Sequence, residues 1–196
     1  MIPPWRIKTS LLQGKLRSAL SFYVLKKQNV AIITQTGTTT QTGDQQSKGL
    51  EATVSGEPGA GLKLRAVYGY TLGKLTNFTE VDPITGAIDN DSGNQPAWVP
   101  HQVFNAWVSH GLLHNTISAA LGVRAVSSSF VDEANTAKVG PYGTLDANFA
   151  YQREHWKATV NLKNLTGTTY FTRAASETAV VPAGGFSVTG GVHLTF

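Results

Sequence analysis

The stretch FSVTGGVHLTF, residues 186–196, decides the fold class. Its apolar residues and Gly190 occupy alternate positions, and Ser, Thr, Gly and His occupy the positions between them. Strict alternation with a period of two predicts a β-strand with one apolar and one polar face. The same period recurs over residues 62–72 and 157–163, so the pattern is a property of the whole chain.

The alternation predicts about eight strands and no helix, because no segment shows a helical period. The strands are expected near residues 16–26, 48–55, 62–72, 102–109, 116–127, 142–152, 157–163 and 186–196. The segment 102–109 carries apolar residues at both sets of alternate positions, so its faces are the least distinct. Several aromatic residues fall toward the strand ends, as in the aromatic girdles of membrane barrels: Tyr68, Tyr70, Trp107, Tyr151 and Trp156.

The predicted connections alternate between short and long. Residues 57–61, 111–115 and 153–155 are tight turns, whereas 28–47, 73–100, 128–141 and 166–185 are long and rich in Gly, Thr, Asn, Asp and Pro. Short turns at one end and long loops at the other are typical of bacterial outer-membrane barrels. The sequence therefore predicts an all-β fold: an antiparallel transmembrane β-barrel segment of about eight strands, with short periplasmic turns and long extracellular loops.

The composition agrees with a wall that faces lipid. Only 14% of the 196 residues are charged, against about 25% in ordinary soluble domains. The chain has no cysteine, which excludes a disulfide scaffold and any thiolate metal site. Its net charge of +4 comes from scattered Lys and Arg, so nucleic acid is not an expected partner.

Catalysis and metal binding are not expected. No Gly-x-Ser-x-Gly elbow occurs, which leaves hydrolase chemistry without support. His110 and His114 are four residues apart but fall in a predicted turn, where this spacing gives no shared helix face. We therefore expect neither an enzyme, nor a resident cofactor, nor a metal ligated by protein side chains.

Two other architectures satisfy the same alternation. One is a complete small outer-membrane barrel of about eight strands with a structural or adhesive role, which requires the first and last strands to pair. The other is a soluble β-sandwich that serves as a binding module.

Five segments carry a resemblance to a known family. In their order and spacing they are similar to strands of the TonB-dependent siderophore receptors. The segments are SKGLEATVSG at 47–56, AVYGYT at 66–71, VPH at 99–101, DEANT at 132–136 continuing through YGTLDA at 142–147, and NLKNL at 161–165 followed by Tyr170 and Phe171.

The resemblance implies an outer-membrane receptor that imports ferric siderophores with energy supplied through TonB. Residues 1–14 resemble the remnant of a preceding strand and its periplasmic turn, and residues 15–196 the C-terminal strands of the receptor barrel. No part of the chain resembles the plug domain, so we expect this chain to be a C-terminal barrel fragment. The implied partners are outer-membrane lipid, the barrel-assembly machinery, the ferric siderophore and, through the missing plug domain, the TonB system.

Three groups of residues are candidates for function. Siderophore recognition uses aromatic and cationic side chains near the outer rim, which points to Trp98, Tyr142, Tyr170, Phe171 and Arg173. The terminal aromatic Phe196 resembles the signal that the barrel-assembly machinery reads. Arg124, Asp146 and Lys163 fall on the predicted polar face near its loop-side end, where we expect a charged cluster in the lumen.

Overall fold

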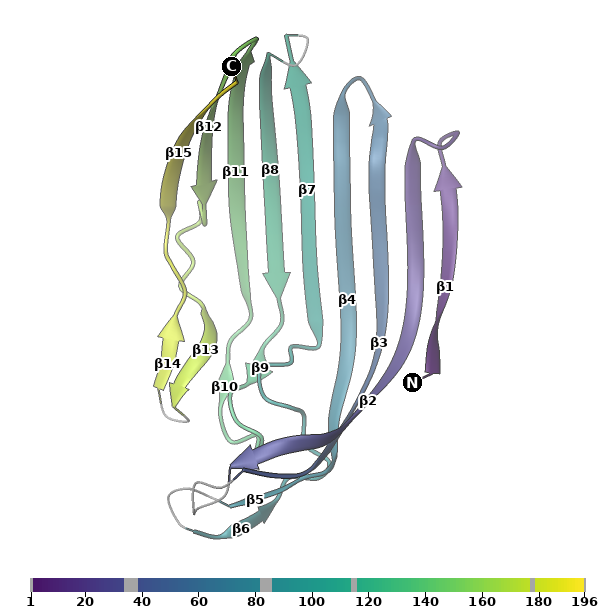
Figure 1. The fold of residues 1–196 in the computed structure, drawn as a ribbon, viewed down its shortest axis with the longest axis vertical. Coiled ribbons are helices and arrows are strands. Elements are labelled where there is room, and N and C mark those ends of the chain that lie inside the picture. The colour runs from purple at the N-terminus through teal and green to yellow at the C-terminus, as the bar shows by residue number, and fades with distance from the viewer. Residues whose placement is uncertain (1, 34–38, 82–85, 114–115, 177–178, 196) are drawn as a thin grey trace.

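Nine long strands form one antiparallel sheet in the computed structural model, which describes residues 2–33, 39–81, 86–113, 116–176 and 179–195. Figure 1 shows neighbouring strands that follow one another along the chain. The strands, in sheet order, are β1 (Ile2–Leu11), β2 (Leu16–Ile33), β3 (Thr39–Gly59), β4 (Leu62–Asn77), β7 (Gln102–Leu112), β8 (Ile117–Val126), β11 (Tyr142–Arg153), β12 (Trp156–Lys163) and β15 (Ser187–Leu194). The all-β antiparallel fold is confirmed, and β1 precedes the eight predicted strands.

The connections are sorted by length, as the sequence predicts. The short turns lie together at one end of the sheet, and the long connections at the other (Figure 1). Three long connections contain small two-stranded sheets: β5 (Thr79–Val81) with β6 (Ile88–Asn90), β9 (Ser129–Phe130) with β10 (Lys138–Val139), and β13 (Phe171–Ser176) with β14 (Ala179–Pro182).

The prediction of a loop over residues 28–47 is wrong, because residues 28–33 belong to β2 and residues 39–47 to β3. The β2–β3 ladder continues past Lys27 to Ile33 and Thr39. A bulge interrupts it between Lys27 and Val30, where Asn29 adopts a φ of 58°. Asn tolerates this left-handed backbone better than most residues, so the hairpin bends here and continues pairing.

Cross-strand register gives the sheet two unlike faces. One row of paired residues is apolar across six strands: Leu64, Val108, Leu121, Ala147, Leu162 and Val188. The next row is Arg65, Trp107, Gly122 and Asp146, and it points to the opposite side. We call these the apolar face and the polar face of the sheet.

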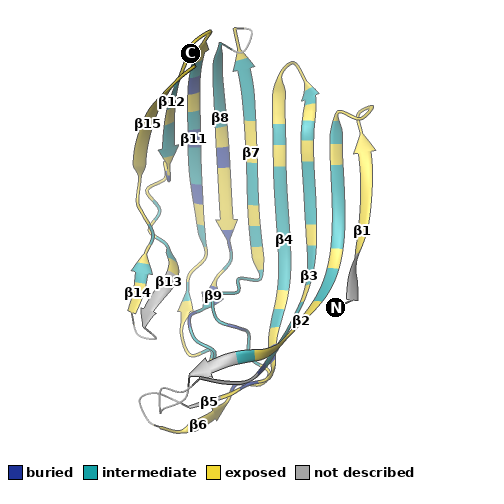
Figure 2. Cartoon of the chain, viewed as in Figure 1, coloured by how far each residue is buried: buried dark blue, intermediate teal, exposed yellow. Residues whose placement is uncertain are grey.

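Protein does not cover the apolar face. Large apolar side chains on it remain exposed, among them Leu121 at 49% and Val188 at 56%. Figure 2 shows that the strands are mostly half-buried or exposed along their length. Among the described residues, one cluster of buried apolar side chains is present. It lies at the loop end of the sheet, where Leu75 of β4 and Phe78 pack with Val30 of β2. An apolar surface of this extent requires another apolar medium or partner to cover it.

Trp107 does not belong to an aromatic girdle, contrary to the prediction. It lies on the polar face, and its ring covers Gly122 so closely that a Cβ at Gly122 would be 2.4 Å from the Trp107 Cε2 atom. The alternation was ambiguous in this segment because a large apolar ring occupies a polar-face position. By contrast, Tyr151 and Trp156 lie near the short turns with ring centroids 5.3 Å apart.

Neither alternative architecture is present. A complete eight-stranded barrel requires the first and last strands to pair, yet in the described residues β1 pairs with β2 and β15 with β12. A sandwich requires two sheets packed face to face, whereas one sheet holds all nine long strands. Within the described ranges, no helix is long and apolar enough to cross a membrane.

Candidate ligand-binding site

A hollow of about 150 Å³ lies on the polar face at the loop end of the sheet. Three of the five predicted ligand residues line it: Trp98, Tyr142 and Phe171. Arg124 of β8 lines it as well, next to Ser129 of β9. The structure therefore brings together aromatic side chains from three different segments with one guanidinium group.

The Tyr170 ring packs against the ring of Tyr142. The two rings are stacked, with their centroids 4.2 Å apart and their planes 20° from parallel. Offset or parallel stacking of this kind adds about 0.5–1.5 kcal/mol beyond the area that it buries. The stacking holds the start of β11 against the 164–170 connection and fixes the orientation of Tyr142 in the hollow.

A buried asparagine organises the connection that carries Tyr170. Asn164 is only 3% exposed and adopts a φ of 51°. Its side-chain amide donates to the Thr168 carbonyl at 2.9 Å and accepts from the Thr168 N–H at 3.0 Å. The Asn164 N–H in turn donates to the Asp146 carboxylate at 2.7 Å. These bonds hold the 164–168 turn against β11 and so fix the backbone from which Tyr170 and Phe171 follow.

Trp98 is held by a loop that is more than thirty residues away in sequence. Its backbone has a φ of 59°, and its N–H donates to the Phe130 carbonyl at 2.8 Å. The Asn135 side chain accepts from the Gln95 N–H at 2.9 Å and donates to the Gln95 carbonyl at 2.7 Å. The Glu133 carboxylate accepts from the Ala97 N–H at 2.9 Å. Residues 130–135 therefore fix the backbone of segment 94–99 at Gln95, Ala97 and Trp98.

Glu133 and Asn135 hold segment 94–99 in place, a role that the sequence reasoning did not assign to them. The DEANT segment supported the family resemblance, but its role as a clamp on residues 94–99 was not inferred. Burial raises the pKa of the Glu133 carboxyl above its ordinary value, and the charges of Asp91 and Asp132 add to this rise. The bond from the Ala97 N–H opposes it, since that bond stabilises the ionised form.

The three residues of the predicted charged cluster share the polar face but form no ion pair among the described residues. Arg124 pairs across the sheet with Thr144 and lines the hollow. Asp146 binds the Asn164 N–H, and Lys163 pairs across the sheet with Ser187.

Two predicted positions fall outside the description. Phe196 lies outside the described residues. The backbone of Arg173 pairs with Val181 in the β13–β14 hairpin, but its side chain is outside the described part.

The polar face as a whole is basic. Regular pairing within the ladders places basic side chains on this face along five strands, whereas its acidic side chains in the same ladders are Glu51 and Asp146. The basic residues are Arg6, Lys8, Arg17, Lys27, Lys63, Arg65, Arg124, Lys157 and Lys163. An excess of one charge over a confined surface attracts ligands of the opposite charge.

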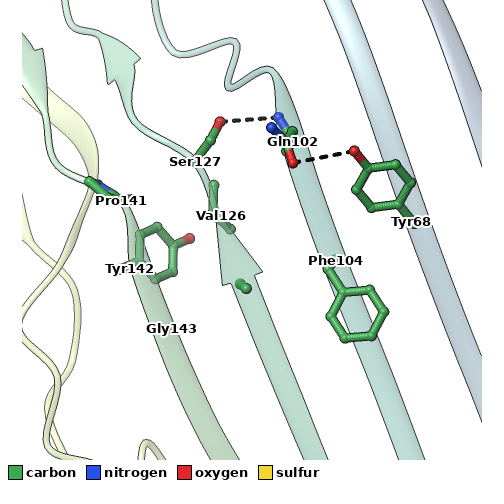
Figure 3. A pocket seen from close by; sticks show the side chains of 9 residues that line it. Tyr68, Gln102, Phe104, Val126, Ser127, Pro141, Tyr142 and Gly143 are labelled. Carbon is green, nitrogen blue, oxygen red and sulfur yellow. Dashed lines mark hydrogen bonds between the residues drawn. The ribbon is translucent and has the colours of Figure 1, made fainter.

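A second, larger hollow of about 460 Å³ opens on the apolar face. Figure 3 shows Tyr68 and Phe104 on neighbouring strands at its side, with Pro141 and Tyr142 opposite. The small residues Ala125 and Gly143 form its floor, and polar groups lie at its loop-side edge, where Tyr68 donates to the Gln102 side chain at 3.3 Å. This hollow shares Val126, Ser127 and Tyr142 with the polar-face hollow, so the two meet at the loop-side ends of β8 and β11.

No group of three or more His, Cys, Asp or Glu side chains capable of holding a metal ion comes together in the described ranges. The chemistry of the polar-face hollow is that of aromatic stacking and a single cation. Such a surface can bind a planar or anionic organic ligand through non-covalent contacts alone.

Comparisons with known proteins give consistent matches. A family model described as "TonB dependent receptor-like, beta-barrel" matches residues 5–165. A ferric-pyoverdine BN7/BN8 receptor of Pseudomonas putida is 27% identical over 169 residues, which are 86% of this chain and 19% of that protein.

Solved structures share the fold. The siderophore receptor PiuA from Acinetobacter baumannii superposes with a TM-score of 0.78 at 24% identity, over 97% of this chain and 28% of that one. The ferric yersiniabactin uptake receptor FyuA from Yersinia pestis gives 0.75 at 17% identity, over 96% of this chain and 28% of that one. The chain thus spans less than a third of the length of these relatives.

Proposed function

Because the chain belongs to the TonB-dependent receptor family of outer-membrane β-barrels, we propose that it forms part of the wall of a receptor that imports ferric siderophores. In this proposal residues 1–14 are the last part of an earlier strand with its periplasmic turn. Residues 15–196 are the C-terminal strands of the barrel. The remaining strands, and a plug domain that engages TonB, belong to the rest of the receptor.

The observation that carries the proposal is the polar-face hollow. Trp98, Tyr142 and Phe171 offer ring faces, and Arg124 offers a cation, at the loop end of the face that is turned toward the barrel lumen. Ferric siderophores are compact complexes with aromatic or anionic donor groups, so both kinds of contact suit them. The relatives named above are receptors for such complexes, which supports the same class of ligand here.

The basic polar face favours an anionic ferric complex over a neutral or cationic one. A lumen wall that carries mainly Lys and Arg raises the local concentration of anions that enter from outside. In this arrangement the hollow makes the first contact at the outer rim. The lysines and arginines nearer the short turns face the plug domain or the path of the ligand.

The direct test is binding by the full-length receptor that contains this chain. The purified receptor is titrated with a panel of ferric complexes, including ferric pyoverdine, ferric yersiniabactin and a ferric catecholate, and intrinsic fluorescence is recorded. We expect saturable quenching by at least one ferric complex and about tenfold weaker binding, equivalent to about 1.4 kcal/mol, when Tyr142→Ala removes a stacking surface.

Val67→Ala is the matched control. Val67 lies on the polar face of β4, outside the hollow, so its truncation removes a polar-face side chain and leaves the site intact. Equal affinity of wild type and Tyr142→Ala would overturn the assignment of the hollow. Absence of binding to every ferric complex, together with unimpaired growth on iron after deletion of the receptor, would overturn the proposed function itself.

A further inference from the structure

The pairing between β8 and β11 is interrupted at the loop end of the sheet. The long ladder ends where Val126 pairs with Tyr142, and the small β9–β10 ladder contains the pair of Ser129 with Val139. Both pairs obey one register, because the second lies three residues further along one strand and three residues back along the other. Two residues on each strand lie between these pairs and belong to neither ladder. We call these four residues the wall break: Ser127, Ser128, Gly140 and Pro141.

The residues of the wall break direct their bonds elsewhere. The Ser127 N–H donates to the Gln102 carbonyl of β7 at 2.9 Å, and the Ser127 hydroxyl accepts from the Gln102 N–H at 3.0 Å. The same hydroxyl donates to the Ser128 carbonyl at 3.3 Å, a local bond of the kind that competes with a sheet ladder. A Cβ added at Gly140 would meet no heavy atom within 4 Å. The wall therefore has open space beside Gly140.

The polar-face hollow and the hollow on the apolar face, which we call the apolar-face hollow, meet at the wall break. Both are lined by Val126, Ser127 and Tyr142, which Figure 3 shows together at the loop-side ends of β8 and β11. Gly140 adds to the lining of the polar-face hollow, and Pro141 to that of the apolar-face hollow. The two hollows therefore adjoin each other, one on each side of the wall.

The apolar-face hollow has the shape and chemistry to hold a hydrocarbon chain. Register sets its residues in one row: Tyr68 pairs with Phe104, Phe104 with Ala125, and Ala125 with Gly143. With strands about 4.8 Å apart, this row is about 14 Å long. None of the residues that line the hollow carries a charge. Its volume of about 460 Å³ lies within the range of small-molecule sites, about 300–1,000 Å³.

The polar-face hollow has the opposite chemistry. It offers the rings of Trp98 and Phe171 together with the guanidinium group of Arg124. Stacking on rings and pairing with a cation suit an anionic aromatic group. A single ligand that fills both hollows is therefore anionic and aromatic at one end and apolar at the other.

We propose that the two hollows together bind a ferric siderophore that carries a fatty-acyl tail, an inference that rests on the proposed function. The ferric head group occupies the polar-face hollow. The tail passes the wall break beside Ser127 and lies along the row from Gly143 to Tyr68, where it is out of water. A ferric siderophore without a tail fills the polar-face hollow alone, so the apolar-face hollow selects for the acylated class.

The test compares two ferric tris-catecholate probes that differ only in one amide substituent, acetyl or decanoyl. Both are titrated against the full-length receptor in nanodiscs, and the quenching of intrinsic fluorescence reports the head group, because Trp98 lines the polar-face hollow. We expect wild type to bind the decanoyl probe about tenfold more tightly than the acetyl probe. Leaving water is worth roughly fourfold in affinity per methylene, and most of this gain cancels because the unbound tail already enters lipid.

Gly143→Leu is the decisive variant, because its side chain fills the apolar-face hollow. The Cβ at this position would be 3.6 Å from the Arg124 carbonyl oxygen, an ordinary contact, so the change introduces no clash. We expect the two probes to bind this variant with affinities within about twofold of each other. Gly190→Leu is the matched control: Gly190 pairs with Val160 on the apolar face of β15, and a Cβ there would be 3.9 Å from the nearest heavy atom. It should keep the tenfold preference.

A diazirine at the end of the decanoyl tail locates the tail directly and requires only the wild-type receptor. Irradiation of the complex should label β4 or β7 near Tyr68 and Phe104. Labelling confined to other strands would place the tail in bulk lipid and overturn the proposal.

The binding data can overturn the proposal in three further ways. Equal affinities of the two probes for wild type would refute the tail site and leave the siderophore site standing. A tenfold preference that persists in Gly143→Leu would show that the tail lies outside the apolar-face hollow. Failure of both probes to bind would show that the head group does not fit the polar-face hollow; if no ferric complex of the panel binds either, the proposed function falls as well. Heat-modifiable migration on gels establishes that each variant is folded.

Discussion

Replacing Asn135 by glycine is expected to release segment 94–99 and with it Trp98. The Asn135 side chain makes two bonds to the backbone of Gln95, at 2.9 Å and 2.7 Å. Glycine removes both bonds and retains the backbone φ of 61° that Asn135 adopts. Each half-buried backbone group that loses its partner costs about 1–1.5 kcal/mol, so the clamp weakens by roughly 2–3 kcal/mol. The open population of the segment then rises by about 30- to 150-fold.

Two further substitutions at Asn135 separate side chain from backbone. Asn135→Ala removes the same two bonds and adds about 1 kcal/mol for a non-glycine residue with positive φ. Asn135→Asp keeps the acceptor for the Gln95 N–H and loses the donor to its carbonyl. The second carboxylate oxygen of Asp would face the carbonyl oxygens of Gln95, Asp132 and Glu133, to which the Asn135 amide donates. We therefore expect Asn135→Asp and Asn135→Ala each to destabilise the segment more than Asn135→Gly does.

Amide hydrogen exchange in the full-length receptor measures this release. The Trp98 N–H, which donates to the Phe130 carbonyl, should exchange faster in Asn135→Gly than in wild type by the factor given above. The Thr168 N–H, which donates to the Asn164 side chain, serves as the internal control and should not change. If the Trp98 amide exchanges at the same rate in both proteins, the clamp does not hold Trp98 and the reasoning is refuted.

Three further outcomes are expected. Burial raises the pKa of Glu133, so the stability of segment 94–99 should fall as the pH rises from the ordinary carboxyl pKa through the raised one. Hydrogen exchange of the Ala97 amide measures this fall, and Glu133→Gln should abolish it. The same pH profile in wild type and Glu133→Gln would contradict the prediction. Gly122→Ala should lower the free energy of unfolding in denaturant by about 1–3 kcal/mol, because the added Cβ would overlap the Trp107 ring. The loss should be far smaller in a Trp107→Ala background. Equal losses in the two backgrounds would contradict the overlap. Deletion of Phe196 should lower the yield of heat-modifiable barrel in the outer membrane, and an unaltered yield would remove its role in assembly.

The strand pattern could be predicted because the period of two is a direct consequence of a wall between two different media. Leu64, Leu162 and Val188 each alternate with polar neighbours, and all lie on the apolar face as expected. Trp107 could not be placed, because its position depends on the space that Gly122 leaves on the next strand. That pairing joins residues fifteen positions apart and leaves no mark in the period of either segment.

The candidate site was predictable in part. Aromatic residues near loop-side strand ends, such as Tyr142 and Phe171, could be selected from position alone. The clamp could not, because Asn135 and Gln95 are forty residues apart and meet only through the packing of two loops. Polar loop residues also bond to solvent in most proteins, so nothing in the DEANT segment distinguishes a clamp from a solvated turn.

The central claim is that a ferric complex sits in the polar-face hollow, and the distance from the iron to that hollow tests it most directly. The chain has no cysteine, so Thr172→Cys, at the hollow, and Lys157→Cys, at the short-turn end of the same face, each introduce one label site in this segment. With the ferric complex bound to full-length receptor, we predict strong relaxation of a nitroxide at position 172 by the paramagnetic iron and weak relaxation at position 157. Equal relaxation at both positions, or stronger relaxation at 157, would contradict the account.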